Sequence, residues 1–451
     1  MASLLKLIKD LFDSLKNSGS FVQNFSYVAG GKLAVILISF ITVPILARLF
    51  SPEAYGHFAI YNSVTLILTM IVLLGYPNSY VLIKSNEDFR SMALFQLMKV
   101  LVTASFILVV VSILGYLNPA LPRIYYFIPF GLLINGFLLV FSNWNVREGL
   151  FKLSSQLEGF GGVGLRLTNV LIGWLGSGYV FGLILGELIG KGVVVGINAS
   201  LLLKSNPLKI NWNRLKKTLW EWRNYPKYVL PNNLISQFSG QLPIYILAIV
   251  FDQKILGYYS MAYTVFSMPI QLFANAIAPV YLKKASDIYE EGLTALKTFT
   301  TKLLSTVNAL LIVPFLIVIL SSEEIIYVFL GDQWGPTGFI VSVMAFPVFT
   351  ELTLGPISSV LQVLRKEKSM LGLNILSAGL MTGASLLVLF VYFEFEDIIF
   401  LLIAVRLFSN LVKVLYIYKL LVISFRRYSI SYLLILAILS IGITKLIEGF
   451  N

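Results

Sequence analysis

Apolar runs long enough to cross a lipid bilayer recur along the whole chain, and they constrain its fold more than any other feature. A helix needs about 20 mainly apolar residues to span the hydrocarbon core. Hydrophobic residues make up 57% of the 451 residues and charged residues only 12%, whereas about a quarter of the residues in a soluble domain are charged. We therefore predict an all-α polytopic membrane protein.

The hydropathy pattern predicts thirteen spans. Their expected bounds are 25–48, 57–82, 94–117, 124–146, 156–176, 178–203, 229–251, 257–282, 298–320, 338–364, 370–392, 398–421 and 429–448.

Lys and Arg residues are concentrated in alternate loops. Of the 34, 25 fall in the N-terminal segment and in every second loop, four in the opposite loops and five inside spans. Because loops rich in Lys and Arg stay in the cytoplasm, we predict a cytoplasmic N-terminus. The net charge of +12 is then explained by topology and by contact with anionic membrane lipids, and we expect no nucleic-acid partner.

Residues 25–82 and 226–283 resemble each other when the chain is shifted by 201 residues without a gap. Each copy has a long apolar helix, a short polar turn ending in Gly and a second apolar helix. Internal duplication of this kind is typical of transporters. The identical positions are Tyr27, Val28, Leu33, Ile45, Leu46, Ala47, Phe50, Gly56 and Val64, matching Tyr228, Val229, Leu234, Ile246, Leu247, Ala248, Phe251, Gly257 and Val265.

Six spans precede the second copy, so both copies enter the membrane in the same orientation. We predict two six-helix bundles related by a pseudo-two-fold axis along the membrane normal, about 12 core helices and an extra C-terminal span. The expected organisation is an amphipathic cytoplasmic segment at 1–24, an N-lobe at 25–203, a basic cytoplasmic linker at 204–228, a C-lobe at 229–421 and the extra span at 422–451.

Charged side chains inside predicted spans are the strongest sign of a functional site, because each costs about 2.5–3.5 kcal/mol at the bilayer centre. Five cations outnumber two acids, which favours a cavity that binds an anionic group such as a phosphate or pyrophosphate. The cations are Arg166, Arg406, Lys32, Lys191 and Lys413, and the acids are Glu187 and Glu351.

Alternative roles remain for most of these residues. Lys32 and Lys413 are near enough to cytoplasmic ends to snorkel. Glu187 and Lys191 are four residues apart, so they share a helix face and can form a structural ion pair. Glu351 is either a protonatable coupling residue, as Glu187 can be, or a neutral hydrogen-bonded side chain.

Uncharged polar side chains form stripes on two neighbouring spans. A stripe at helical spacing lines a water-filled path or holds helices together. Because these stripes run nearly the full depth of the membrane, we predict a polar path. Its expected residues are Asn233, Gln237, Gln241, Thr264, Ser267, Gln271 and Asn275.

The residue inventory argues against an enzyme. The chain has no Cys and a single His, which excludes thiol catalysis and His-rich metal sites. It also contains no phosphate loop or catalytic triad, and its expected outer loops are short. We predict no cofactor, no bound metal and no catalytic residue.

Three segments resemble blocks of the polysaccharide-synthesis transporters, the oligosaccharide flippases of the multidrug/oligosaccharidyl-lipid/polysaccharide exporter superfamily. They are ARLFSPEAYGHFAIYNSV at 47–64, NVREGLFKLSS with GLRLTNVLIGWLG between 145 and 176, and YVFLGDQWGPTGFIVSVMA at 327–345. The resemblance implies two bundles around a cationic cavity that work by alternating access. Its members are expected to have twelve or fourteen spans, so thirteen departs from the pattern.

The resemblance also implies a substrate class, an undecaprenyl-pyrophosphate-linked oligosaccharide such as an O-antigen unit of lipopolysaccharide. A flippase of this kind would move it to the outer leaflet of a bacterial inner membrane, beside the polysaccharide polymerase machinery. Proton or sodium coupling is plausible. The alternatives are a drug or cation exporter, for which a more acidic cavity is expected, a membrane polymerase or ligase, and a structural partner in glycan assembly.

Overall fold

A computed structural model describes residues 20–120, 122–176, 179–204, 210–276, 278–391 and 393–423. Sixteen α-helices occur within these residues, with short 3-10 and π turns between some of them. Contacts divide the chain into two compact units. The N-unit is Gln23–Ser260, and the C-unit contains the helices that follow Met261. The division falls inside α10, so the lobe boundaries at 204–228 stay a prediction.

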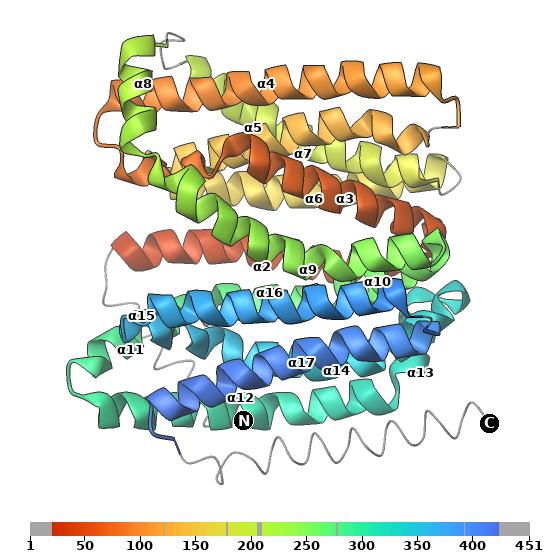
Figure 1. The fold of residues 1–451 in the computed structure, drawn as a ribbon, viewed down its shortest axis with the longest axis vertical. Coiled ribbons are helices and arrows are strands. Elements are labelled where there is room, and N and C mark those ends of the chain that lie inside the picture. The colour runs from red at the N-terminus through yellow and green to blue at the C-terminus, as the bar shows by residue number, and fades with distance from the viewer. Residues whose placement is uncertain are drawn as a thin grey trace. The chain divides into compact units, whose positions relative to one another are not determined.

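The N-unit contains α2 from Gln23 onwards and seven complete helices, and the long helices run side by side (Figure 1). They are α2 (Ser20–Leu49), α3 (Pro52–Leu73), α4 (Asn86–Leu117), α5 (Ile128–Arg147), α6 (Phe151–Leu175), α7 (Val180–Lys204), α8 (Trp212–Glu221) and α9 (Leu230–Val250), with the turns η1 (Tyr76–Leu82), η2 (Arg123–Phe127) and η3 (Tyr225–Val229).

The C-unit begins within α10 and is built mainly on α14, which packs against α11, α12, α13 and α17. Its elements are α10 (Gln253–Ala276), α11 (Ala278–Tyr289), α12 (Leu293–Leu320), α13 (Ser322–Leu330), η4 (Asp332–Trp334), α14 (Gly335–Ser358), α15 (Val360–Val363), α16 (Glu367–Phe390) and α17 (Phe395–Leu420).

The chain is a multi-pass membrane protein. Nine helical segments of the described residues are long and apolar enough to cross a bilayer. They are Pro52–Leu73, Asn86–Leu117, Arg123–Arg147, Val180–Leu203, Tyr225–Val250, Leu293–Leu320, Asp332–Val363, Lys368–Phe390 and Phe395–Leu420. The long helices α2, α6 and α10, at the spans predicted for 25–48, 156–176 and 257–282, are not among these nine segments of the described residues.

Two predicted spans were drawn too long. The span predicted at 57–82 ends at Leu73, because Leu74 and Gly75 both adopt the left-handed conformation and Pro77 starts a 3-10 turn. The span predicted at 257–282 is divided between α10 and α11. Hydropathy does not detect these breaks, since apolar residues continue through them.

Other predicted segments lie only partly, or not at all, within the described residues. The amphipathic segment at 1–24 lies outside them up to residue 19, and α2 begins at Ser20. The span at 429–448 lies outside them as well. The outer loop at 321–337 contains the short helix α13, which packs on α14.

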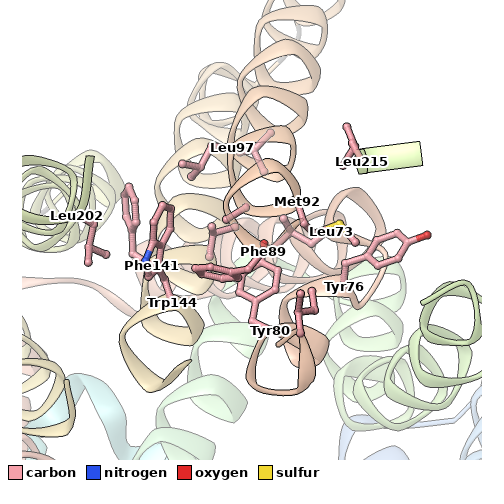
Figure 2. Close-up of a cluster of buried hydrophobic side chains, with 14 residues drawn as sticks. Leu73, Tyr76, Tyr80, Phe89, Met92, Leu97, Phe141, Trp144, Leu202 and Leu215 are labelled. Atoms are coloured by element: carbon pink, nitrogen blue, oxygen red, sulfur yellow. The ribbon is translucent and has the colours of Figure 1, made fainter. Parts of the chain in front are cut away.

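An aromatic cluster closes the end of the N-unit at which α4 begins (Figure 2). Phe89 packs edge-on against Tyr80 and Trp144, with ring centroids 5.2 and 5.1 Å apart. Aromatic pairs in this geometry add about 0.5–1.5 kcal/mol beyond the area they bury. Leu215 of α8 is buried in the same cluster, so the helix within the basic linker is packed onto the N-unit.

A reciprocal glycine contact joins the starts of α3 and α10 within the N-unit. A Cβ atom on Gly56 would lie 2.0 Å from the carbonyl oxygen of Gln253, and one on Gly257 would lie 1.8 Å from that of Pro52. Gly56 and Gly257 are equivalent in the 201-residue register, as are Pro52 and Gln253. Each copy therefore contacts the other through the same pair of positions, as in an isologous interface.

Gly56→Ala should lower the melting temperature by several degrees, because the new methyl group would force the two backbones apart at a cost of about 1–3 kcal/mol. Gly196→Ala is the matched control, since nothing lies within 4 Å of a Cβ there and alanine favours a helix over glycine by about 1 kcal/mol. Thermal unfolding in detergent, followed by tryptophan fluorescence, measures both. Equal melting temperatures for the two variants would contradict the close approach.

Candidate functional site

Close packing of α6 on α7 brings charged residues of the two helices together. A Cβ on Gly186 would lie 1.6 Å from Oδ1 of Asn169, and one on Gly190 would lie 2.5 Å from Cα of Leu165. Only glycine leaves room for so short an interhelical distance. As a result Arg166 of α6 lies within electrostatic range of Glu187 of α7.

Glu187 is the centre of the N-unit cluster. It is 3% exposed, and its Oε1 atom accepts a hydrogen bond from the ammonium group of Lys191, one helical turn along α7. Lys191 also donates to Oδ1 of Asn135 on α5, at 2.8 Å. The predicted pairing of Glu187 with Lys191 is therefore present in the structure, and α5 supplies a third member that sequence analysis did not identify.

Arg166 is the second cation of the N-unit cluster. Its Nε atom donates to Oγ of Ser39 on α2, 3.2 Å away, and Tyr55 of α3 is within its electrostatic range. Helices α2, α3, α5, α6 and α7 thus all contribute to one buried polar network. A charge in such surroundings is stable only when it is paired or hydrogen-bonded.

The C-unit contains a second cluster, between α14 and α17. Arg406 donates to Oε1 of Glu351 through Nη2 at 2.8 Å and through Nε at 3.3 Å. The two side chains are 24% and 27% exposed. Lys413, two turns along α17, lies within electrostatic range of both.

Asn410 holds the same two helices together one turn beyond Arg406. Its amide donates to Oγ1 of Thr350 at 2.9 Å and to the carbonyl oxygen of Pro347 at 3.3 Å. These bonds hold α17 against α14 at Thr350, the residue before Glu351. The ion pair is therefore held in place by neighbouring hydrogen bonds.

The two clusters contain the same set of charges, one acid and two cations. In each unit one carboxylate forms an ion pair with one cation and has a second cation within electrostatic range. Glu187 pairs with Lys191 and interacts with Arg166, and Glu351 pairs with Arg406 and interacts with Lys413. Each cluster consequently has a net charge of +1. The excess positive charge of this arrangement attracts an anion.

The remaining predicted residues are placed by the structure only in part. Lys32 is in α2, but its side chain lies outside the described residues, as do those of Gln271 and Asn275 in α10. Asn233, Gln237 and Gln241 are half-buried at successive turns of α9. In α10, Ser267 donates back to the carbonyl of Thr264 at 2.8 Å. The polar path stays a prediction.

Sequence analysis missed the neutral partners of the two clusters. Asn135 could have been found, because it is an amide within an apolar span. Asn410 carries the same signal, whereas Ser39 and Tyr55 do not, since hydroxyl and phenol side chains are common in this chain. Only the packing of the helices identifies them.

A family model described as polysaccharide biosynthesis protein matches residues 45–338. It covers the eleven helices from α3 to α13 and the reciprocal glycine contact. A search of curated protein sequences found no match.

Solved structures share the fold. The lipid II flippase MurJ in an inward closed conformation has a TM-score of 0.60 at 15% identity, covering 86% of each chain. A Vibrio cholerae MATE transporter scores 0.54 at 13% identity, covering 93% of this chain and 98% of its own. A Pyrococcus furiosus transporter of the MOP superfamily scores 0.52 at 14% identity, covering 88% and 95%. These matches confirm the resemblance seen in the sequence, with a MurJ- and MATE-like fold.

Removing the acid of the C-unit cluster should destabilise the protein more than removing either cation. Glu351→Gln leaves Arg406 and Lys413 uncompensated, whereas Arg406→Gln leaves one acid with one cation. Loss of one partner of a fully buried pair costs about 3–5 kcal/mol, and the effect here is smaller because the pair is partly exposed. Lys413→Met, which removes the excess charge, should unfold at or above the wild-type temperature.

Thermal unfolding of the purified variants tests this order. A Glu351→Gln variant as stable as wild type, or a Lys413→Met variant less stable than Glu351→Gln, would contradict a carboxylate shared by two cations.

Proposed function

The chain belongs to the polysaccharide biosynthesis protein family, and from that premise we propose that it is a flippase for a polyprenyl-pyrophosphate-linked oligosaccharide. The observation that carries the proposal is the charge of the two clusters, each with one carboxylate between two cations. A drug-cation exporter requires the opposite balance, because a net positive site repels its substrate.

The pyrophosphate would bind by replacing the carboxylates. Arg166 and Arg406 provide planar donors that suit bidentate phosphate contacts, and Lys191 and Lys413 add point charges. Lys32 is the fifth proposed contact. While the site is empty, Glu187 and Glu351 keep the cations paired, which lowers the cost of holding them in the membrane. When the phosphate groups arrive, the cations change partner.

The glycan would cross through the polar path on α9 and α10, while the prenyl chain remains in the bilayer. The path comprises the half-buried amides of α9 together with Thr264, Ser267, Gln271 and Asn275. No bond is made or broken in this process. The proposed energy source is a proton or sodium gradient acting on Glu187 or Glu351.

The finer architecture is part of the same proposal. It comprises two six-helix bundles about a pseudo-two-fold axis, alternating access, a cytoplasmic N-terminus and a bacterial inner membrane. The reciprocal contact of Gly56 and Gly257 supports the axis, since equivalent positions of the two copies meet there. The charge asymmetry of the loops supports the orientation.

Among the solved structures, MurJ is named as a lipid II flippase, and a lipid-linked glycan is the chemistry that fits the cationic clusters here. The MATE transporters share the fold. A polymerase, a ligase or a structural partner would leave the two cationic clusters inside the membrane without a role. An O-antigen unit is one substrate of the proposed class.

Arg166→Ala and Arg406→Ala should each slow translocation by about 10–100-fold, the loss expected when a charge-assisted hydrogen bond of about 1.5–3 kcal/mol is removed. The assay uses proteoliposomes that contain undecaprenyl-pyrophosphate-linked oligosaccharide and a glycan-cleaving enzyme added outside. Protein-dependent cleavage of the inner-leaflet pool reports translocation.

Arg214→Ala is the matched control and should translocate at the wild-type rate. The Arg214 side chain is 49% exposed on α8 and pairs with Glu87 at 2.6 Å. The variant therefore removes an arginine without changing either cluster. Wild-type rates in both cluster variants, at equal amounts of reconstituted protein, would refute the proposed phosphate site.

A further inference from the structure

The short helix α8 lies at the end of the N-unit at which α4 begins, and it runs across the long helices instead of beside them (Figure 1). Its buried residues, Leu215 and Thr218, face the N-unit. The hydroxyl group of Tyr76 in η1 donates to the carbonyl oxygen of Leu219 at 3.3 Å. With 10 residues, α8 is too short to cross a bilayer. An amphipathic helix of this kind lies in the plane of the membrane surface.

The two flanks of α8 contact α4 at different depths. On one flank, Nη1 of Arg214 pairs with Glu87 at 2.6 Å, in the first turn of α4. On the other flank, the ring of Trp212 packs edge-on against Phe95, with centroids 6.3 Å apart. Phe95 follows Glu87 by eight residues, which places it about 12 Å further into the span. The flank with Trp212 therefore faces the bilayer, and the flank with Arg214 faces away from it.

The flank that faces the bilayer carries a stripe of aromatic and basic side chains. Lys216 and Trp220 follow Trp212 at intervals of one turn, and Arg223 continues the stripe just after α8 ends. All four side chains are exposed, Trp212 to 59% and Trp220 to 70%. Tryptophan favours the interface between membrane and water, and basic side chains there are attracted to anionic headgroups. We call these four residues the basic flank.

Trp220 holds Arg223 on the basic flank. The guanidinium group of Arg223 lies 4.3 Å from the centre of the Trp220 ring, and its Nη1 atom donates to the carbonyl oxygen of Trp220 at 3.2 Å. Neither contact neutralises the charge. Because an arginine side chain has five N–H donors, donors remain for a phosphate group.

The acidic side chains of this region lie on the opposite flank. Glu221 follows Arg214 by two helical turns and therefore shares its face of α8. Asp88 of α4 is also near Arg214, with Oδ1 3.8 Å from Nη1. The basic flank contains two cations and no acid, so it is the side of α8 that attracts an anion.

A third cation lies next to the basic flank, one turn deeper in the span than Phe95. The ammonium nitrogen of Lys99 is 5.7 Å from the centre of the Phe95 ring and 6.0 Å from that of Tyr76. This nitrogen is buried and has no hydrogen-bond partner among the described residues. Since a buried charge is costly unless it is paired, Lys99 strengthens the attraction of this region for an anion.

We propose that the basic flank binds the headgroups of anionic phospholipids in the leaflet that it adjoins. The lipid phosphates contact Lys216 and Arg223, and the rings of Trp212 and Trp220 lie among the glycerol groups and upper acyl chains. Each cation near an anionic membrane surface favours such binding by a factor of about five. The surface is separate from the two charge clusters and does not depend on the flippase function.

Quenching of tryptophan fluorescence by brominated phospholipids tests the proposal, because bromine quenches only at close range. The protein is placed in nanodiscs of phosphatidylcholine with a minority of phosphatidylglycerol, and equal numbers of brominated molecules are supplied as one lipid or the other. Bromine on phosphatidylglycerol should quench several-fold more strongly. Trp212→Phe/Trp220→Phe should lose most of this difference, since these two rings lie on the basic flank.

Two charge variants locate the preference on α8. Lys216→Gln/Arg223→Gln should be quenched equally by the two brominated lipids. Arg214→Gln/Lys217→Gln is the matched control, because it removes the same charge from the flank that faces away from the bilayer, and it should keep the preference. All four of these side chains are exposed, so the packing of α8 on the N-unit is unchanged in both variants.

Equal quenching by the two brominated lipids in the wild-type protein would overturn the proposal, as would a preference that persists in Lys216→Gln/Arg223→Gln. Loss of the preference in both variants would attribute it to net charge and would overturn the basic flank as its source. Farnesyl pyrophosphate, at concentrations well below that of phosphatidylglycerol, should leave the preference unchanged. Its loss under that condition would assign the surface to pyrophosphate lipids instead. The measurement involves no transport, so a failure of the flippase function leaves its result intact.

Discussion

A carboxylate shared by two cations, inside a membrane protein, is the interaction on which the proposed mechanism depends. A single charge in these surroundings would be too costly, and one acid with one cation would leave no net charge to attract a phosphate. One acid with two cations satisfies both requirements. Each unit contains this arrangement, around Glu187 and around Glu351. Asn135 and Ser39 accept hydrogen bonds from the cations of the first cluster, and Asn410 donates one between the two helices of the second.

The packing of the helices serves this charge arrangement. Glycines on α7 allow α6 to approach closely enough for Arg166 to reach Glu187 electrostatically. Gly56 and Gly257 allow the same close approach between α3 and α10. Small residues, where side chains would otherwise separate the backbones, therefore determine how closely these pairs of helices pack.

Sequence analysis predicted the membrane class, the family resemblance and the charged residues within spans. It also predicted the Glu187–Lys191 pair, because residues four apart on a helix share a face. It did not predict the pairing of Glu351 with Arg406, which are 55 residues apart. The ends of two spans were misplaced because apolar residues continue past Leu73 and through the break between α10 and α11.

The sequence by itself determined that this chain crosses the membrane repeatedly, that it carries an excess of cations there and that two of its segments resemble each other. These properties depend on composition and on spacing along the chain. Only the tertiary structure decided which cation meets which acid. Those contacts depend on interhelical distances, which are set by side-chain volume at positions far apart in the sequence.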